Sequence, residues 1–261
     1  MNSLEKEMVE VLTDLRDNYG AVDVKAEFES EGARLNELMR LKEIASRCGM
    51  GIVLKIGGPE AIRDIFDAMT LGVSGIVAPM VESAYALQKF LEAIAKHVPE
   101  DAKSDIAFAV NVETIQAYQN LDRMLALPGA HQLSRITVGR VDLCGSLDLG
   151  RQEINSEKIF EITKGICEKT RAAKLSPTIG GAITPEAIPF IRQLVDANLL
   201  DRFETRKIIF SASKGLEDAA ESLRRANRFE LQWLCNKHDY YHVISVEDKE
   251  RIRMLEKRTM L

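Results

Sequence analysis

The feature that most constrains the fold of this chain is a regular alternation of short apolar runs with longer segments of helical periodicity. Several of the apolar runs are nearly continuous Val, Ile and Ala, which is typical of strands buried on both faces of a sheet. This alternation indicates a parallel sheet with helical crossovers. The expected strands are residues 21–27, 51–56, 74–79, 105–112, 135–141, 177–182 and 205–210.

The segments between these runs carry the spacing of amphipathic helices. Ile62, Ile65, Phe66 and Met69 fall at i, i+3, i+4 and i+7, so they share one helix face. Gly72 follows as a helix stop. Six or seven such strand–helix units in one chain favour a closed barrel, although an open doubly wound sheet is an alternative.

The predicted fold class is therefore α/β, a single parallel (β/α)8-type TIM barrel, which commonly uses roughly 250 residues. Seven strands are recognisable, and residues 240–246 (YYHVISV) are a weak candidate for the eighth. We expect residues 1–261 to form one domain, with residues 1–20 as an N-terminal helix and residues 211–261 as a helical extension. This extension exceeds what a barrel needs, so we expect it to pack on a neighbouring subunit of a homo-oligomer.

The composition of the chain indicates which classes of binding partner to expect. The formal net charge is -5, which argues against a nucleic-acid binder, and no run of about eighteen apolar residues predicts a membrane helix. The four cysteines form no CxxC pair, and the first residues lack the apolar core of a signal peptide. These features predict a cytoplasmic protein that acts on a small molecule.

Two acidic residues follow strongly apolar runs on neighbouring predicted strands. In parallel barrels, functional residues gather at the C-terminal ends of the strands, where Glu113 and Asp142 are placed. Two carboxylates are what Mg²⁺ typically takes from a protein, with water and substrate completing its coordination. The alternative is that each carboxylate pairs with Lys25, Lys55 or Arg206 in a structural ion network, and the spacing alone supports both readings equally.

Further polar residues and glycines fall at the same predicted end of the barrel. The backbone amides of Gly-Gly pairs there could bind a carboxylate or phosphate, although a tight turn with positive φ is the commoner role of such glycines. The candidates at the strand ends are Lys25, Glu27, Glu29, Lys55, Gly57, Gly58, Pro79, Gly139, Arg140, Gly180 and Gly181.

Three segments resemble motifs of one known family. Residues 75–83 (GIVAPMVES) are similar to its strand-and-turn "ivPmvEs", and residues 112–114 (VET) to its metal-binding "iET". Residues 138–143 (VGRVDL), followed by Ser146 and Leu147, are similar to its "GpxDLsxslG". The chain thus resembles the HpcH/HpaI aldolase and citrate lyase β-subunit family over roughly residues 20–210.

The resemblance implies a phosphoenolpyruvate/pyruvate-type barrel in which Glu113 and Asp142 hold Mg²⁺, Mn²⁺ or another divalent ion. It implies a metal-dependent carbon–carbon lyase of the aldolase type. Such an enzyme cleaves or forms a bond next to the carbonyl of a 2-oxo acid, through a metal-stabilised pyruvate-like enolate. In other branches of the family the substrate is a citryl- or malyl-thioester, so an acyl-thioester substrate is the alternative.

The chain departs from the family pattern at three positions. No histidine follows Glu27 and Glu29, which are closer to the acidic "DLED" of the citrate lyase branch, so either is a candidate general base. Lys55 replaces an arginine and is expected to contact substrate oxygens. Arg140 replaces a proline and is expected to hold a distal carboxylate or phosphate.

Two other hypotheses follow from the same residues. Lys25 or Lys55 could form a Schiff base with a substrate carbonyl if an apolar site lowered its pKa. The missing histidine and arginine also suggest a non-catalytic, regulatory barrel. The metal-dependent lyase explains more of the motif residues and is the leading prediction.

Overall fold

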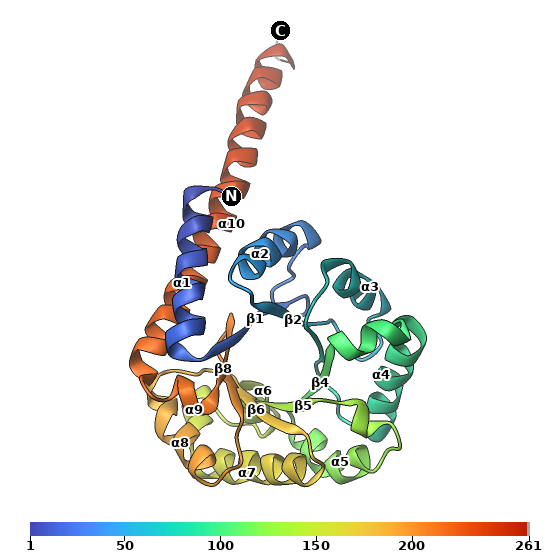
Figure 1. The fold of residues 1–261 in the computed structure, drawn as a ribbon. Helices are drawn as coiled ribbons and strands as arrows, with labels where there is room; N and C mark the ends of the chain where they lie inside the picture. Colours follow the sequence, from blue (N-terminus) through green and yellow to red (C-terminus); the bar gives the residue numbers. More distant parts are fainter. Residues whose placement is uncertain (260–261) are drawn as a thin grey trace.

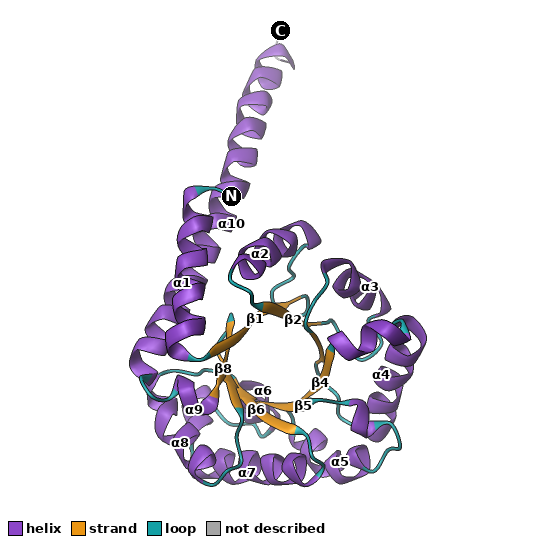
Figure 2. Cartoon of the chain, viewed as in Figure 1, coloured by secondary structure: helices purple, strands orange, loops and turns teal. Residues whose placement is uncertain are grey.

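The computed structural model describes residues 1–259, which form a closed eight-stranded barrel surrounded by helices (Figures 1 and 2). This confirms the predicted TIM-type α/β barrel. The strands neighbour one another in chain order around the barrel. They are β1 (Ala21–Glu27), β2 (Gly51–Lys55), β3 (Gly75–Ala78), β4 (Ala107–Val112), β5 (Arg135–Gly139), β6 (Ser176–Gly180), β7 (Arg202–Glu204) and β8 (Ile208–Ser211).

The helices surround the barrel, and the buried apolar residues of most of them face its strands, whereas α10 packs mainly on α1. They are α1 (Ser3–Tyr19), α2 (Leu35–Arg47), α3 (Ile62–Leu71), α4 (Ala84–His97), α5 (Ile115–Leu125), α6 (Arg140–Ser146), α7 (Glu157–Ala172), α8 (Ile188–Asp196), α9 (Ala212–Gly215) and α10 (Ala219–Thr259). Four 3₁₀ turns complete the chain: η1 (Glu100–Asp105), η2 (Ala130–Gln132), η3 (Arg151–Asn155) and η4 (Pro185–Ala187). No helix within residues 1–259 is both long and apolar enough to cross a membrane.

The barrel is closed by a hairpin that the sequence did not predict. The expected seventh strand, residues 205–210, is correct only in its second half: residues 208–210 belong to β8, whereas residues 205–207 connect β7 to β8. β8 pairs antiparallel with both β7 and β1. Phe203 and Phe210 stack with their ring centroids 5.0 Å apart and join the two short strands. The candidate eighth strand at residues 240–246 is also wrong, because these residues lie within α10.

Because β8 runs backward, the chain leaves the barrel at the end opposite to the C-terminal ends of β1–β7. α10 therefore starts near the N-terminal ends of β1–β7. It packs beside α1 and runs antiparallel to it. Arg225 pairs with Asp14, and further along Gln232 donates to Glu7. The C-terminal part of α10 extends beyond the barrel (Figure 1).

The inward-facing residues of the strands change character along the barrel axis. Val53, Val77, Ala109 and Ile209 form a small apolar cluster inside the barrel. Two residues further along β2 and β4, the pleat brings Lys55 and Asn111 to the same inner face, where both line the cavity described below. The barrel is therefore packed in its middle and polar at the C-terminal ends of its strands, where TIM barrels carry their sites.

Candidate active site

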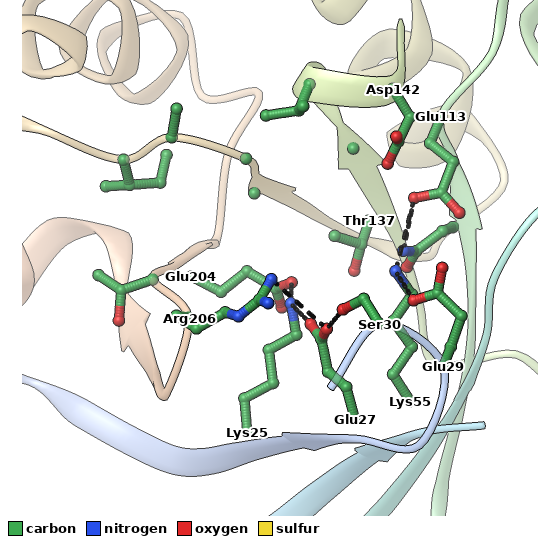
Figure 3. A pocket seen from close by; sticks show the side chains of 18 of the residues that line it. Lys25, Glu27, Glu29, Ser30, Lys55, Glu113, Thr137, Asp142, Glu204 and Arg206 are labelled. Carbon is green, nitrogen blue, oxygen red and sulfur yellow. Dashed lines mark hydrogen bonds and ion pairs between the residues drawn. The ribbon is translucent and has the colours of Figure 1, made fainter. Parts of the chain in front are cut away.

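A cavity of about 640 Å³ opens at the C-terminal ends of the strands, and many of the side chains that line it are charged (Figure 3). Its acidic residues outnumber its basic residues by two. An excess of two negative charges in a partly buried cavity favours a bound divalent cation. The acidic residues are Glu27, Glu29, Glu113, Asp142, Glu204 and Glu230, and the basic residues are Lys25, Lys55, Arg151 and Arg206.

Glu113 is held at the junction between β4 and α5. Thr114 caps α5 by accepting from the amide of Ala117 at 3.1 Å, so the strand ends at Val112 and Glu113 faces the cavity. The side chain of Glu113 is only 2% exposed. Gly139 on the neighbouring strand leaves room for it, because a Cβ there would lie 2.6 Å from an oxygen of Glu113.

The two oxygens of Glu113 accept hydrogen bonds that fix their direction. Oε1 accepts from the backbone amide of Met80 at 2.8 Å, and Oε2 accepts from Nδ2 of Asn111 at 3.0 Å. Met80 adopts a φ of 50°, which is unfavourable for this residue type and typical of functional sites. Burial raises the pKa of Glu113, Lys55 opposes this rise, and the nearby charge of Asp142 adds to it.

Asp142 lies in the first turn of α6, and its carboxylate points toward the same space as that of Glu113 (Figure 3). Within the described part of the chain it makes no ion pair and accepts no hydrogen bond. No group of three or more His, Cys, Asp or Glu side chains in residues 1–259 could hold a metal ion. Two carboxylates that leave open positions for substrate oxygens match the usual protein contribution to a Mg²⁺ site.

Lys25 and Glu27 belong to a buried ion network on β1. Nζ of Lys25 lies 2.5 Å from Oε1 of Glu204 and 2.9 Å from Oε1 of Glu27. Burial opposes ionisation of Glu27, but Lys25 and a hydrogen bond from Ser30 hold its pKa at about 2. Burial would lower the pKa of Lys25, yet Glu204 and Glu27 raise it well above its usual range.

Lys55 stands between Glu29 and Glu113. Its Nζ lies 3.0 Å from Oε2 of Glu29 and 3.9 Å from Oε2 of Glu113. Burial would lower the pKa of Lys55, but Glu113 and Glu27 raise it. A lysine of raised pKa is protonated at neutral pH, so Lys55 is an ammonium that can donate hydrogen bonds. The side chain of Glu29 is 31% exposed, so it is accessible from the cavity.

The remaining predicted residues divide between the cavity and other places. Gly139, Gly180 and Gly181 line the cavity, and their role in substrate binding stays a prediction. Gly57 and Gly58 instead line a separate, shallow pocket beside Tyr85. Pro79, on the β3–α4 loop, is not among the residues that line the cavity.

Arg140 does not face the cavity. Its side chain is fully buried, and the guanidinium donates to backbone carbonyls of the loop after β6. The predicted strand of residues 135–141 ends at Gly139, because α6 begins at Arg140 and turns this side chain behind the cavity wall. The expected contact between Arg140 and a substrate anion therefore needs correction.

Several cavity residues were not singled out by the sequence. Thr137 lies on β5 two residues before Gly139, so strand alternation could have found it. Glu204 ends a strand of three residues, too short for a periodic signal. Asn227 and Glu230 come from α10, and no local pattern indicates that this helix passes the cavity.

The fold and this site define a TIM-barrel protein with an acid-rich cavity at the C-terminal ends of its strands. Residues 11–179 match the model of the HpcH/HpaI aldolase/citrate lyase family. The chain belongs to this family, which supports an aldolase- or lyase-type function. No curated protein matches the chain.

Solved structures of low sequence identity share the fold. An HpcH/HpaI aldolase from Desulfitobacterium hafniense DCB-2 is 13% identical, with a TM-score of 0.61 over 78% of this chain and 82% of that chain. The citrate synthase SbnG is 17% identical, with a TM-score of 0.62 over 87% of this chain and 90% of that chain. A family member from Burkholderia cenocepacia J2315 is 17% identical, with a TM-score of 0.55 over 87% of this chain and all of that chain, 100%.

Proposed function

We propose that this protein is a divalent-metal-dependent carbon–carbon lyase that cleaves or forms the bond next to the carbonyl of a 2-oxo acid. The observation that carries the proposal is the pair of carboxylates, Glu113 and Asp142, which face one cavity whose acidic side chains exceed its basic ones by two. Membership of the aldolase/citrate lyase family supports the reaction class.

In this proposal Glu113 and Asp142 hold Mg²⁺ or Mn²⁺. The bound ion would polarise the substrate carbonyl and stabilise the negative charge that develops beside it. The amides of Met80 and Asn111 orient Glu113 toward the ion. Lys55, as an ammonium, donates hydrogen bonds to substrate oxygens.

Glu29 is the better of the two predicted general bases. Glu27 has a pKa of about 2 and is paired with Lys25, so it is a weak proton acceptor at neutral pH. Glu29 is also paired, with Lys55, but it lines the cavity and its side chain is 31% exposed, so it is accessible for taking a proton directly or through water. Lys25 instead pairs with Glu27 and Glu204, and these three side chains form an ion network in the cavity wall.

A second candidate is a lyase or condensing enzyme for citryl- or malyl-thioesters. Glu27 ends β1 and Glu29 follows two residues later. No histidine follows them closely in the sequence, which agrees with the resemblance to the citrate lyase branch. One of the similar folds is named as a citrate synthase. Turnover of a thioester, with none of a free 2-oxo acid, would favour this candidate.

Metal affinity is expected to fall as pH is lowered. The proton and the cation compete for Glu113, and its raised pKa makes protonation begin at a higher pH than for an ordinary carboxyl. Titration of Mn²⁺ by isothermal calorimetry between about pH 8 and about pH 5, with and without oxalate, measures this competition. A protein that binds neither Mn²⁺ nor oxalate would instead be the regulatory barrel.

Borohydride is expected to trap no adduct. A Schiff base needs a neutral amine, and ion pairs raise the pKa of both Lys25 and Lys55. Mass spectrometry after incubation with pyruvate and borohydride checks the result, and EDTA should abolish turnover. A trapped peptide that contains either lysine, with activity retained in EDTA, would establish the Schiff-base route.

We also propose that α10 joins two copies of the chain. Its distal part extends beyond the barrel and exposes large apolar side chains, which single domains seldom leave uncovered. They are Val243, Ile244, Val246, Ile252 and Leu255.

The cytoplasmic location of the protein stays a prediction from the sequence.

The double variant Ile252→Glu, Leu255→Glu is expected to be smaller in solution than the wild type, because charges at these positions oppose helix pairing. Light scattering coupled to size exclusion measures the mass. Arg253→Glu on the same helix is the control for added negative charge and should keep the wild-type mass. An unchanged mass for the double variant would contradict the proposed interface.

A further inference from the structure

Arg140 ties together two separate segments of the cavity wall. Its Nε lies 3.3 Å from the carbonyl oxygen of Gly180, and its Nη2 lies 2.8 Å from that of Gly181 and 3.4 Å from that of Ala182. Its Nη1 donates at 2.9 Å to Oδ1 of Asn155, the last residue of η3. One buried guanidinium thus joins the loop after β6 to η3.

These contacts fix the direction of three backbone amides. In a trans peptide the N–H points opposite to the carbonyl of the same peptide unit, and no cis bond occurs among the described residues. Since the carbonyls of residues 180–182 face Arg140, the amides of Gly181, Ala182 and Ile183 point away from it. All three residues line the cavity, and within residues 1–259 none of these amides donates a backbone hydrogen bond.

The backbone conformation of this loop is specific. Gly181 and Ala182 have φ values of 84° and 46°. A Cβ at Gly181 would lie 2.9 Å from the amide nitrogen of Val141, so only glycine allows the loop to approach the first turn of α6 this closely. Consecutive amides that converge from such a turn form a concave anion-binding surface.

Arg151 contributes a charge to the same wall. It is the first residue of η3, the segment that Arg140 holds through Asn155, and it lines the cavity. Within the described chain, Arg151 makes no ion pair. The other basic residues of the cavity are all paired: Lys25 with Glu27 and Glu204, Lys55 with Glu29, and Arg206 with Glu31.

We propose that Arg151 and the amides of Gly181, Ala182 and Ile183 form a subsite for a second anionic group of the substrate. This proposal rests on the proposed function for the 2-oxo acid part of the substrate, and adds that the substrate is a dicarboxylate or a phosphate monoester. Arg140 is then a positioning residue, which acts behind the wall and touches no ligand.

Anion titration tests the subsite without turnover. Inorganic phosphate and succinate are titrated separately into the wild type, Arg151→Met and Arg206→Met, with isothermal calorimetry as the readout. We expect one anion to bind the wild type and Arg151→Met to bind it about tenfold to a hundredfold more weakly, as for loss of a charge-assisted hydrogen bond. Arg206→Met should retain binding, because Glu27 and Glu31 already offset its charge.

The tighter of the two anions identifies the substrate group as phosphate or carboxylate. Binding of neither anion to the wild type, or an equal loss in the two variants, would overturn the subsite. A second measurement compares kcat/KM for 2-oxo acid substrates with and without the second anionic group, and Arg151→Met should lose the preference for the charged substrate. If the wild type shows no lyase activity, the proposed function fails while the titration still decides the subsite.

Discussion

Replacing Glu113 by Gln is expected to lower kcat of the lyase reaction by about a hundredfold to a thousandfold, the scale seen when one group that stabilises transition-state charge is removed. Glutamine keeps the shape and can still accept from Met80 through its carbonyl, so the fold should be retained. It cannot supply the negative charge that a divalent ion requires. Mn²⁺ binding should therefore weaken in parallel with turnover.

Glu82→Gln is the matched control for this substitution. Glu82 accepts a hydrogen bond from Thr114 at 2.6 Å, close to Glu113 along the chain, but it is not among the residues that line the cavity. It should retain Mn²⁺ binding and turnover. Full metal-dependent turnover in Glu113→Gln would show that the proposed metal site is wrong.

Replacing Lys25 by Met is expected to lower the free energy of unfolding by about 3–5 kcal/mol at neutral pH, because it removes the closest counter-charge of two buried carboxylates and leaves Glu27 only the more distant Arg206. Glu27 and Glu204 both pair with this ammonium. Urea unfolding followed by circular dichroism measures the change. The double variant Lys25→Met, Glu204→Gln should regain part of the loss, since only one uncompensated charge remains.

The sign of the pH dependence follows from Glu27. Its pKa falls from the ordinary 4.5 to about 2 in the folded protein, so its stabilising effect is present above pH 4.5 and is lost as pH falls toward 2. Lys25→Met removes the largest of the effects that lower this pKa, while the hydrogen bond from Ser30 and the charge of Lys55 remain. The difference in stability between wild type and variant should therefore shrink on acidification, and a difference that grows would contradict the ion network described here.

The long parallel strands were readable from the sequence because they are apolar on both faces. β4 and the acidic residue after it stand out, since five apolar or small residues precede Asn111 in its strand and loop. The hairpin of β7 and β8 did not stand out, because β7 has only three residues and places a single apolar residue, Phe203, between Arg202 and Glu204. The predicted strand at residues 205–210 combined the connection at residues 205–207 with most of β8, and it missed β7.

Residues of the candidate site could be predicted from the sequence only where they directly follow a recognisable strand. Glu113 follows β4 directly, and its place could be predicted from register alone. Arg140 follows β5 just as directly, yet its side chain turns behind the wall, because a helix begins at that residue. Which side of the wall a long side chain takes depends on partners such as Asn155 and the loop after β6, which are distant along the chain.

The pairing of β8 with β1 has a consequence for biosynthesis. The first strand leaves the ribosome well before its partner at residues 208–211, because the two strands lie far apart along the chain. Until then β1 and β7 expose unpaired edges that can hydrogen-bond to other nascent chains. A premature stop before β8 would therefore yield an aggregating fragment rather than a smaller barrel. The barrel closes only when β8 pairs with β1.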